Sequence, residues 1–141
     1  SMKSSTKSGC RVSRELGTIQ GGIYRGTLGS STTAGGTLIG QGSRTSEDGL
    51  NEISLTAESG ENLNVTGFEP LIIALHVKTT SNQNNAKQYF SPEVYGISAA
   101  ASGISVSRTK NVSLSSLPSS PGDGESLGDW SNTKGFVAYI N

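Results

Sequence analysis

Asn51-Glu-Ile-Ser-Leu-Thr-Ala57 is the stretch of the sequence that decides the fold. Its apolar residues Ile53, Leu55 and Ala57 alternate with polar residues, and a period of two is typical of a strand buried on one face. The segment from Leu71 to Lys78 is almost continuously apolar, which predicts a central strand covered on both faces. Both stretches indicate a β-sheet protein.

Two later stretches alternate in the same way, residues 103–108 and residues 135–140, with Phe136, Ala138 and Ile140 on one face. No stretch has a helical pattern longer than a turn or two. We therefore predict an all-β protein: an antiparallel β-sandwich or jelly-roll-like domain with an extended Gly/Ser-rich N-terminal region.

Composition divides the chain into three regions. Residues 1–16 form a basic, Ser-rich arm, in which Ser1 resembles the scar left by tag cleavage. Residues 17–50 form a Gly-rich extended or β region, and residues 51–141 form the β-sandwich domain. In the second region we expect glycine to mark turns, bulges and places where backbones approach closely.

The core is expected to be thin. Hydrophobic residues make up 32% of the 141 residues, 16% are charged, and the formal net charge is zero. Because so little apolar surface is available, we expect the domain to finish its burial against copies of itself. No apolar run is long enough for a membrane helix, and the N-terminus lacks the apolar stretch of a signal peptide, so no membrane insertion is expected.

The N-terminal arm carries Lys3, Lys7, Arg11 and Arg14, with no acidic residue before Glu15. An arm of this kind could contact nucleic acid or an acidic partner. Because no aromatic residues are interleaved with the cations, a solvated leader is the favoured interpretation. We do not expect nucleic acid as a partner.

Few residues offer catalytic chemistry. His76 is the single histidine and lies inside the predicted strand 71–78, where it shares a face with Ala74, so a structural role is favoured. No Gly-x-Ser-x-Gly turn is present, and a pairing of Cys10 with His76 would need the arm to reach the strand. We predict that the protein is not an enzyme. The alternative is a hydrolase of small substrates that uses His76 or loop carboxylates.

Metal and cofactor sites are not expected either. One cysteine and one histidine cannot supply a usual zinc ligand set. Asp123, Glu125 and Asp129 lie in a Gly-rich loop and are of the ligand type that calcium takes, but their spacing matches no EF-hand. A solvated acidic loop is favoured, and we predict no catalytic residues, no metal and no cofactor.

Trp130 is the first candidate for ligand binding. It lies in a long polar loop together with Asp129 and Asn132. There an indole ring can stack on a sugar, while carboxylate and amide groups bind the hydroxyls of that sugar. The alternative is that Trp130 folds back to cap one end of the sandwich.

A second candidate site ends the Asn-rich loop of residues 79–87. Tyr89 and Phe90 follow this loop and Asn84 lies within it, which places aromatic rings beside amide groups. Both candidate sites suit a cell-surface glycan or protein as the partner.

Two parts of the sequence resemble a known family. Asn64-Val-Thr-Gly-Phe-Glu-Pro70, followed by the apolar strand to Lys78, is similar to the opening of distal domains of bacteriophage tail fibres, and residues 130–141 are similar to the strand that ends them. The resemblance spans about residues 62–141. It implies homotrimeric fibres at the virion surface or outside the cell, whose tip loops contact host glycans or proteins. The basic start, and the lack of a coiled-coil heptad or a His-x-His pair, depart from that pattern.

The resemblance thus predicts a non-enzymatic structural and receptor-binding module, with residues 17–42 packed near a trimer axis. One alternative is a bacterial extracellular adhesin or carbohydrate-binding module that acts as a monomer. Another is a capsid or decoration subunit whose basic arm contacts nucleic acid or a neighbouring subunit.

Overall fold

The computed structural model describes residues 2–4, 7–12, 17–27, 35–67, 69–79, 94–99, 107–121 and 138–140. Every regular element in these ranges is a β-strand, and every strand pair is antiparallel. The sheets pack together as a β-sandwich, so the predicted fold class is confirmed.

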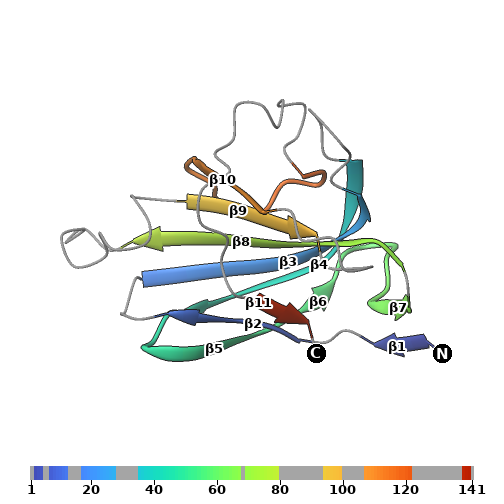
Figure 1. Ribbon diagram of the computed structural model, residues 1–141, viewed down its shortest axis with the longest axis horizontal. Coiled ribbons are helices and arrows are strands. Elements are labelled where there is room, and N and C mark those ends of the chain that lie inside the picture. The colour runs from blue at the N-terminus through green and yellow to red at the C-terminus, as the bar shows by residue number, and fades with distance from the viewer. Residues whose placement is uncertain are drawn as a thin grey trace.

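The largest sheet has six strands in the order β10-β9-β8-β3-β4-β6. Its strands are β10 (Ser107–Asn111), β9 (Val94–Ala99), β8 (Leu71–Thr79), β3 (Gly17–Thr27), β4 (Gly35–Thr45) and β6 (Thr56–Ala57). A three-stranded sheet joins β11 (Ala138–Ile140), β2 (Lys7–Val12) and β5 (Gly49–Ser54), and β1 (Met2–Ser4) pairs with β7 (Asn64–Thr66). In Figure 1 the three-stranded sheet lies along the lower side of the molecule.

Strand β8 is the central strand that its apolar run predicts. It lies between β3 and β9, and the side chains from Leu71 to Val77 are all buried. Alternate residues enter different clusters: Leu75 and Val77 lie on one face of the sheet, and Ala74 on the other. The prediction of a strand covered on both faces is confirmed.

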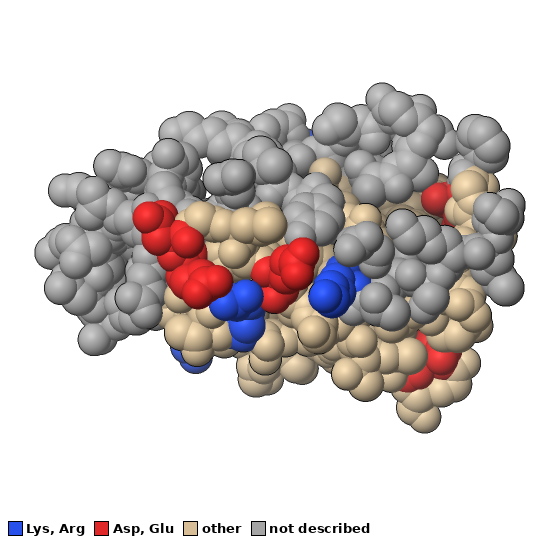
Figure 2. Space-filling model, turned by 90° about the horizontal axis from the view of Figure 1, so that it is seen from below, with Lys and Arg blue, Asp and Glu red and all other residues tan. Residues whose placement is uncertain are grey.

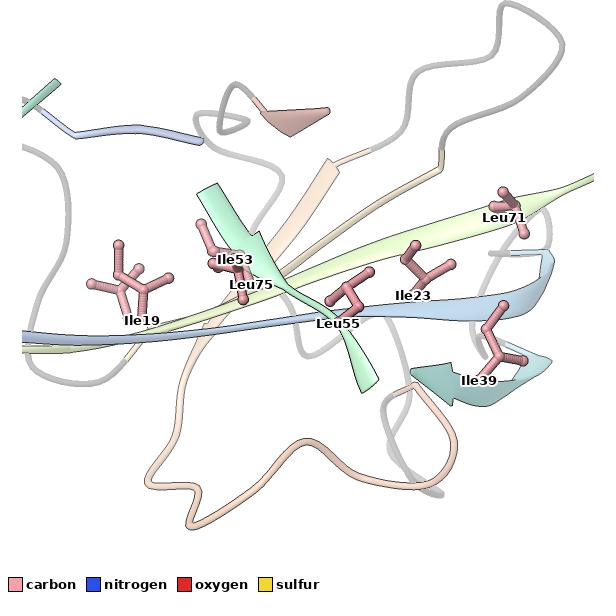
Figure 3. Close-up of a cluster of buried hydrophobic side chains, with 8 residues drawn as sticks. Ile19, Ile23, Ile39, Ile53, Leu55, Leu71 and Leu75 are labelled. Atoms are coloured by element: carbon pink, nitrogen blue, oxygen red, sulfur yellow. The ribbon is translucent and has the colours of Figure 1, made fainter. Parts of the chain in front are cut away.

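The first of these faces packs against the three-stranded sheet. Figure 3 shows Ile53 of β5, and Leu55, which follows β5, among side chains of β3, β4 and β8. This aliphatic cluster is Ile19, Ile23, Ile39, Ile53, Leu55, Leu71, Leu75 and Val77. Ile140 of β11 packs against it, so the last strand also closes this layer, as its alternation predicts.

The stretch from Asn51 to Ala57 is broken into two strands rather than forming one. Its first part is β5 in the three-stranded sheet, and its last two residues are β6 at the edge of the six-stranded sheet. The chain crosses between the sheets at Leu55, so Ile53 and Leu55 are buried as predicted, whereas Ala57 is exposed.

Glycine makes this crossing possible. A Cβ atom at Gly42 would overlap the carbonyl oxygen of Ser54, and one at Gly21, the residue paired with Gly42, would lie 2.7 Å from Cδ1 of Ile53. The β3–β4 pairing also contains a bulge between Ile23 and Tyr24. The expectation that glycine marks close backbone approach is thus confirmed.

The N-terminal residues contribute strands to the fold. Residues 7–12, which the sequence predicts to be part of a solvated leader, form β2 at the centre of the three-stranded sheet. Lys7 is exposed, whereas the neighbouring Ser8 is only 3% exposed. The structure differs from the prediction because β2 is held by hydrogen-bonded ladders with β5 and β11. These two strands are distant in sequence, so no local pattern indicates the pairing.

Candidate functional site

The predicted ligand residues lie outside the described part of the chain. They are Asn84, Tyr89, Phe90, Asp129, Trp130 and Asn132. The described strands fix where their segments begin and end: residues 80–93 connect Thr79, which is paired with Gly17, to Val94, which is paired with Val77. Residues 122–137 connect Pro121 to β11. The calcium-type residues Asp123 and Glu125 also lie outside the described ranges.

Polar side chains gather instead on the second face of the six-stranded sheet. Gln20 of β3, His76 of β8 and Tyr95 of β9 are register partners on neighbouring strands. His76 is 1% exposed, and Nδ1 of His76 lies 2.9 Å from Oε1 of Gln20. As predicted, His76 shares its face with Ala74.

The hydrogen bonds of Gln20 determine which nitrogen of His76 carries hydrogen. Nε2 of Gln20 donates to the carbonyl oxygen of Ser115 at 2.9 Å, and a carbonyl oxygen can only accept. This bond orients the amide, so Oε1 must accept from Nδ1–H of His76. The result is a chain of hydrogen bonds from His76 through Gln20 to the backbone at residue 115.

A second chain of hydrogen bonds lies beside the first and starts at Tyr95. The hydroxyl of Tyr95 donates to the hydroxyl of Tyr24 at 3.2 Å, and Tyr24 donates to the carbonyl oxygen of Pro118 at 2.5 Å. Burial raises the pKa of Tyr95 to about 12, although the bond with Tyr24 opposes part of this rise. The phenol therefore stays neutral and able to donate throughout the physiological range.

Both hydrogen-bond chains end on one segment, residues 112–121, which we call the strap. It contains no regular element and follows β10 directly. Leu117 is 4% exposed, Pro121 is fully buried, and the amide of Leu38 donates to the carbonyl of Ser119 at 2.9 Å. The strap thus covers the second face of the sheet, much as the three-stranded sheet covers the first.

Gly22 provides the space that Leu117 occupies. A Cβ atom at Gly22 would lie 2.5 Å from Cδ1 of Leu117 and 3.0 Å from the carbonyl oxygen of Gly40. We call the surface formed by Gln20, Gly22, Tyr24 and Leu38 the groove. It binds the strap through side-chain donors that meet backbone carbonyls, and through a hollow that takes one leucine.

Charges are distributed differently on the two sides of the molecule. Strand register places Lys78, Arg108 and Lys110 on the strap side, where the described strands carry no acidic residue. On the opposite side, Figure 2 shows acidic and basic side chains next to one another. Lys7 and Glu52 form an ion pair of this kind at 3.8 Å.

A separate ion pair fixes the turn between β7 and β8. Arg25 pairs with Glu69 and also donates to the carbonyl of Asn64 at 3.1 Å, while the amide of Thr66 donates to Glu69 at 3.0 Å. The Thr66 amide and the Arg25 guanidinium lower the pKa of Glu69. This cluster holds Asn64, Thr66 and Glu69, which belong to the stretch on which the family resemblance rests, against the end of β3.

The arrangement around His76 differs from that of a Ser-His-Asp triad. In a Ser-His-Asp triad a carboxylate orients the ring, whereas here the amide of Gln20 does so. In the ranges that the structure describes, no three His, Cys, Asp or Glu side chains are grouped to hold a metal ion. His76 contacts Gln20, and Gln20 in turn binds the backbone carbonyl of Ser115.

The described residues include no helix long and apolar enough to cross a membrane. The chain was also compared with known proteins in three ways. It matches no protein-family model, no curated protein and no solved structure. Inferences about its function therefore depend on its own residues.

The alternation of strand β8 predicts the face on which His76 lies, but no pattern in the sequence predicts that Gln20, Tyr24 and Tyr95 lie on the same face. One local signal was available: Pro118-Ser-Ser-Pro121 has the spacing of an extended proline-containing segment. The side chains that bind this segment come from β3, β8 and β9, and their proximity depends on strand order. No pattern within any one of these strands reveals it.

Proposed function

We propose that this protein is a non-enzymatic structural and host-surface recognition module of the tail-fibre kind, which acts as a homotrimer at the virion surface. Its ligand is a cell-surface glycan or protein. Under this proposal the sandwich is a rigid support, and the segments that join its strands bind the host. Binding residues are commonly carried by loops on rigid scaffolds.

One observation supports the assignment of host contact to the connecting segments: both faces of the six-stranded sheet are already covered within the chain. The three-stranded sheet covers one face, and the strap covers the other. The polar side chains of the second face bind the strap, so they are engaged in holding the fold together. The proposal assigns contact with a host to the connecting segments 80–93 and 122–137, because they contain the aromatic residues singled out from the sequence.

A combined binding and mass measurement tests the proposal. Light scattering is expected to give three times the mass of one chain, and a glycan and surface-protein array is expected to give hits that Trp130→Ala abolishes. The matched control is Leu50→Ala, since Leu50 is a large apolar side chain that is 47% exposed on β5. Hits unchanged in Trp130→Ala would remove the Trp130 site, and a monomer that still binds would favour the adhesin alternative.

A further inference from the structure

Arg25, near the end of β3, connects this strand to β7 and to the turn that follows β7. Its Nη2 donates to the carbonyl oxygen of Asn64 at 3.1 Å and to that of Asn62 at 3.4 Å, and its Nη1 pairs with the carboxylate of Glu69. The amide of Thr66 donates to the other oxygen of that carboxylate at 3.0 Å. We call this cluster of Arg25, Glu69 and the backbone groups that they bind the clasp.

Glu69 is the residue on which the clasp depends. Its two carboxylate oxygens have separate partners: Oε1 accepts from Arg25, and Oε2 accepts from the amide of Thr66. The amide of Glu69 also donates to the carbonyl oxygen of Thr66 at 3.4 Å, so the turn is closed in both directions. The side chain of Glu69 is only 17% exposed, so its attraction to Arg25 is screened less than that of a fully exposed ion pair.

Strand β1 is attached to the residues that the clasp holds. Its ladder runs from Met2, which is paired with Thr66, to Ser4, which is paired with Asn64. Among the described strands β1 pairs with β7 alone, and Figure 1 shows the two together at one end of the molecule. An isolated two-stranded ribbon is at best marginally stable in water, so the attachment of β1 requires β7 to be held in place.

Part of the support for β7 does not depend on charge. Leu63 and Val65 are partly buried and pack against the aliphatic cluster. Without the clasp, β7 would keep these apolar contacts but would lose the bonds to the backbone of Asn62, Asn64 and Thr66. The attachment of β1 can therefore change while the core between the sheets stays intact.

We propose that the clasp is an acid-sensitive switch, which attaches β1 to the sandwich while Glu69 is ionised and releases β1 when Glu69 takes up a proton. A protonated carboxyl group no longer attracts the guanidinium of Arg25, and one of its oxygens becomes a hydroxyl that faces another donor. The switch is independent of the proposed host recognition, because it involves none of the residues assigned to that role.

The direction of the pH dependence follows from the surroundings of Glu69. The hydrogen bond from the Thr66 amide lowers the pKa of Glu69 most, the bond from Arg25 lowers it further, and burial opposes part of this shift. Among the described residues, Arg25 is the charged group that acts on this carboxylate. The unfolded chain, with an ordinary pKa of 4.5, thus binds the proton more readily than the folded chain. The clasp is complete well above pH 4.5 and is lost as the pH falls through the lowered pKa.

The ion pair of Lys7 and Glu52 provides a matched control. Its atoms lie 3.8 Å apart, and its side chains are 47% and 44% exposed. It joins β2 to β5 and makes no contact with β7 in the described structure. Because solvent screens this pair and it lies outside the clasp, Glu52→Gln should leave β1 attached.

Amide hydrogen exchange followed by NMR tests the switch. Between about pH 6 and about pH 3, the protection factors of the amides in the β1–β7 ladder are expected to fall about tenfold, while the amide of Leu38, bonded to Ser119, keeps its protection. In Glu69→Gln the ladder should already have the lower protection at about pH 6 and should lose no more on acidification. Glu52→Gln should behave as the unmodified protein does.

Two results would overturn the switch. One is full protection of the β1–β7 ladder in Glu69→Gln at about pH 6, and the other is an equal loss of protection at Leu38 on acidification, which would mean that the whole fold opens. If Glu69→Gln does not fold, Arg25→Lys decides, because lysine keeps the charge but lacks the fork that binds several oxygens at once. Release in Arg25→Lys is expected at a higher pH than in the unmodified protein, and an unchanged midpoint would reject the switch.

Discussion

The two faces of the six-stranded sheet are covered by different means. The first face is aliphatic, and it packs against a second sheet through Ile53 and Leu55. The second face carries Gln20, His76, Tyr24 and Tyr95, and it is covered by a strap without regular structure. Burial of apolar area is non-directional, whereas hydrogen bonds demand specific partners.

The two faces stabilise the fold in partly different ways. Both bury apolar side chains, which each contribute about 1.5–3 kcal/mol, and on the second face these include Leu38, Ile72 and Ile97. The second face adds hydrogen bonds, each of which contributes about 1 kcal/mol net. These hydrogen bonds select one extended segment in one register, so attachment of the strap should depend on them.

The largest effect is expected from Ile53→Ala on the aliphatic face. Ile53 is 1% exposed, and its truncation leaves a cavity between the sheets. The free energy of unfolding should fall by about 4 kcal/mol in urea titration. Leu50→Ala, on the same strand but exposed, should change it by less than about 0.5 kcal/mol. Similar losses for the two variants would contradict the assignment of the core.

The next largest loss in the free energy of unfolding is expected from Gly42→Ala. The added methyl group would overlap the backbone oxygen of Ser54, which cannot rotate away as a side chain would. A loss of about 3 kcal/mol in the free energy of unfolding is expected. Gly35→Ala is the control on the same strand, because a Cβ there meets only one atom, at 4.0 Å. A Gly42→Ala protein as stable as Gly35→Ala would show that the sheets are farther apart.

Alkaline titration probes the polar face. The pKa of Tyr95 is raised from 10.0 to about 12, so the folded chain holds this proton at pH values where the unfolded chain loses it. The stabilisation is complete below pH 10 and is lost as the pH rises towards 12, by up to about 2.5 kcal/mol. Urea titrations at several pH values should show this loss, and Tyr95→Phe should lack it. An identical pH dependence in both proteins would place Tyr95 in contact with solvent.

Tyr24→Phe should have the smallest effect on stability and a clear effect on the strap. It removes the donor to Pro118 and the acceptor for Tyr95, at a cost of about 1 kcal/mol. The amide of Leu38, which is bonded to Ser119, should then exchange its hydrogen faster. The amide of Gly26, bonded to Pro70, is the internal control. Equal acceleration at both amides would mean that the fold loosens as a whole.

Much of the fold could be predicted because its signals are local. Alternation over Asn51–Leu55 and the apolar run of β8 are visible within single segments, and both correspond to observed strands. The break at Leu55 was missed, since it depends on Gly42 and Gly21 allowing a second chain to come close. Strand β2 was missed because its partners, β5 and β11, are distant in sequence.

The candidate site was less predictable for the same reason. The ligand residues chosen from the sequence, such as Trp130 and Tyr89, lie outside the described residues and remain predictions. The groove is built from pairs that are far apart along the chain: Gln20 and His76 are 56 residues apart, and Tyr24 and Pro118 are 94 apart.

The sequence by itself determined that this protein is built of strands, that β8 is buried on both faces, and that His76 faces the same way as Ala74. These properties follow from the period of two along one strand. Only the tertiary structure decided that Gln20, His76 and Tyr95 form one row and that the strap lies across it. Strand order and register bring such residues together, and both are set by contacts between segments distant in sequence.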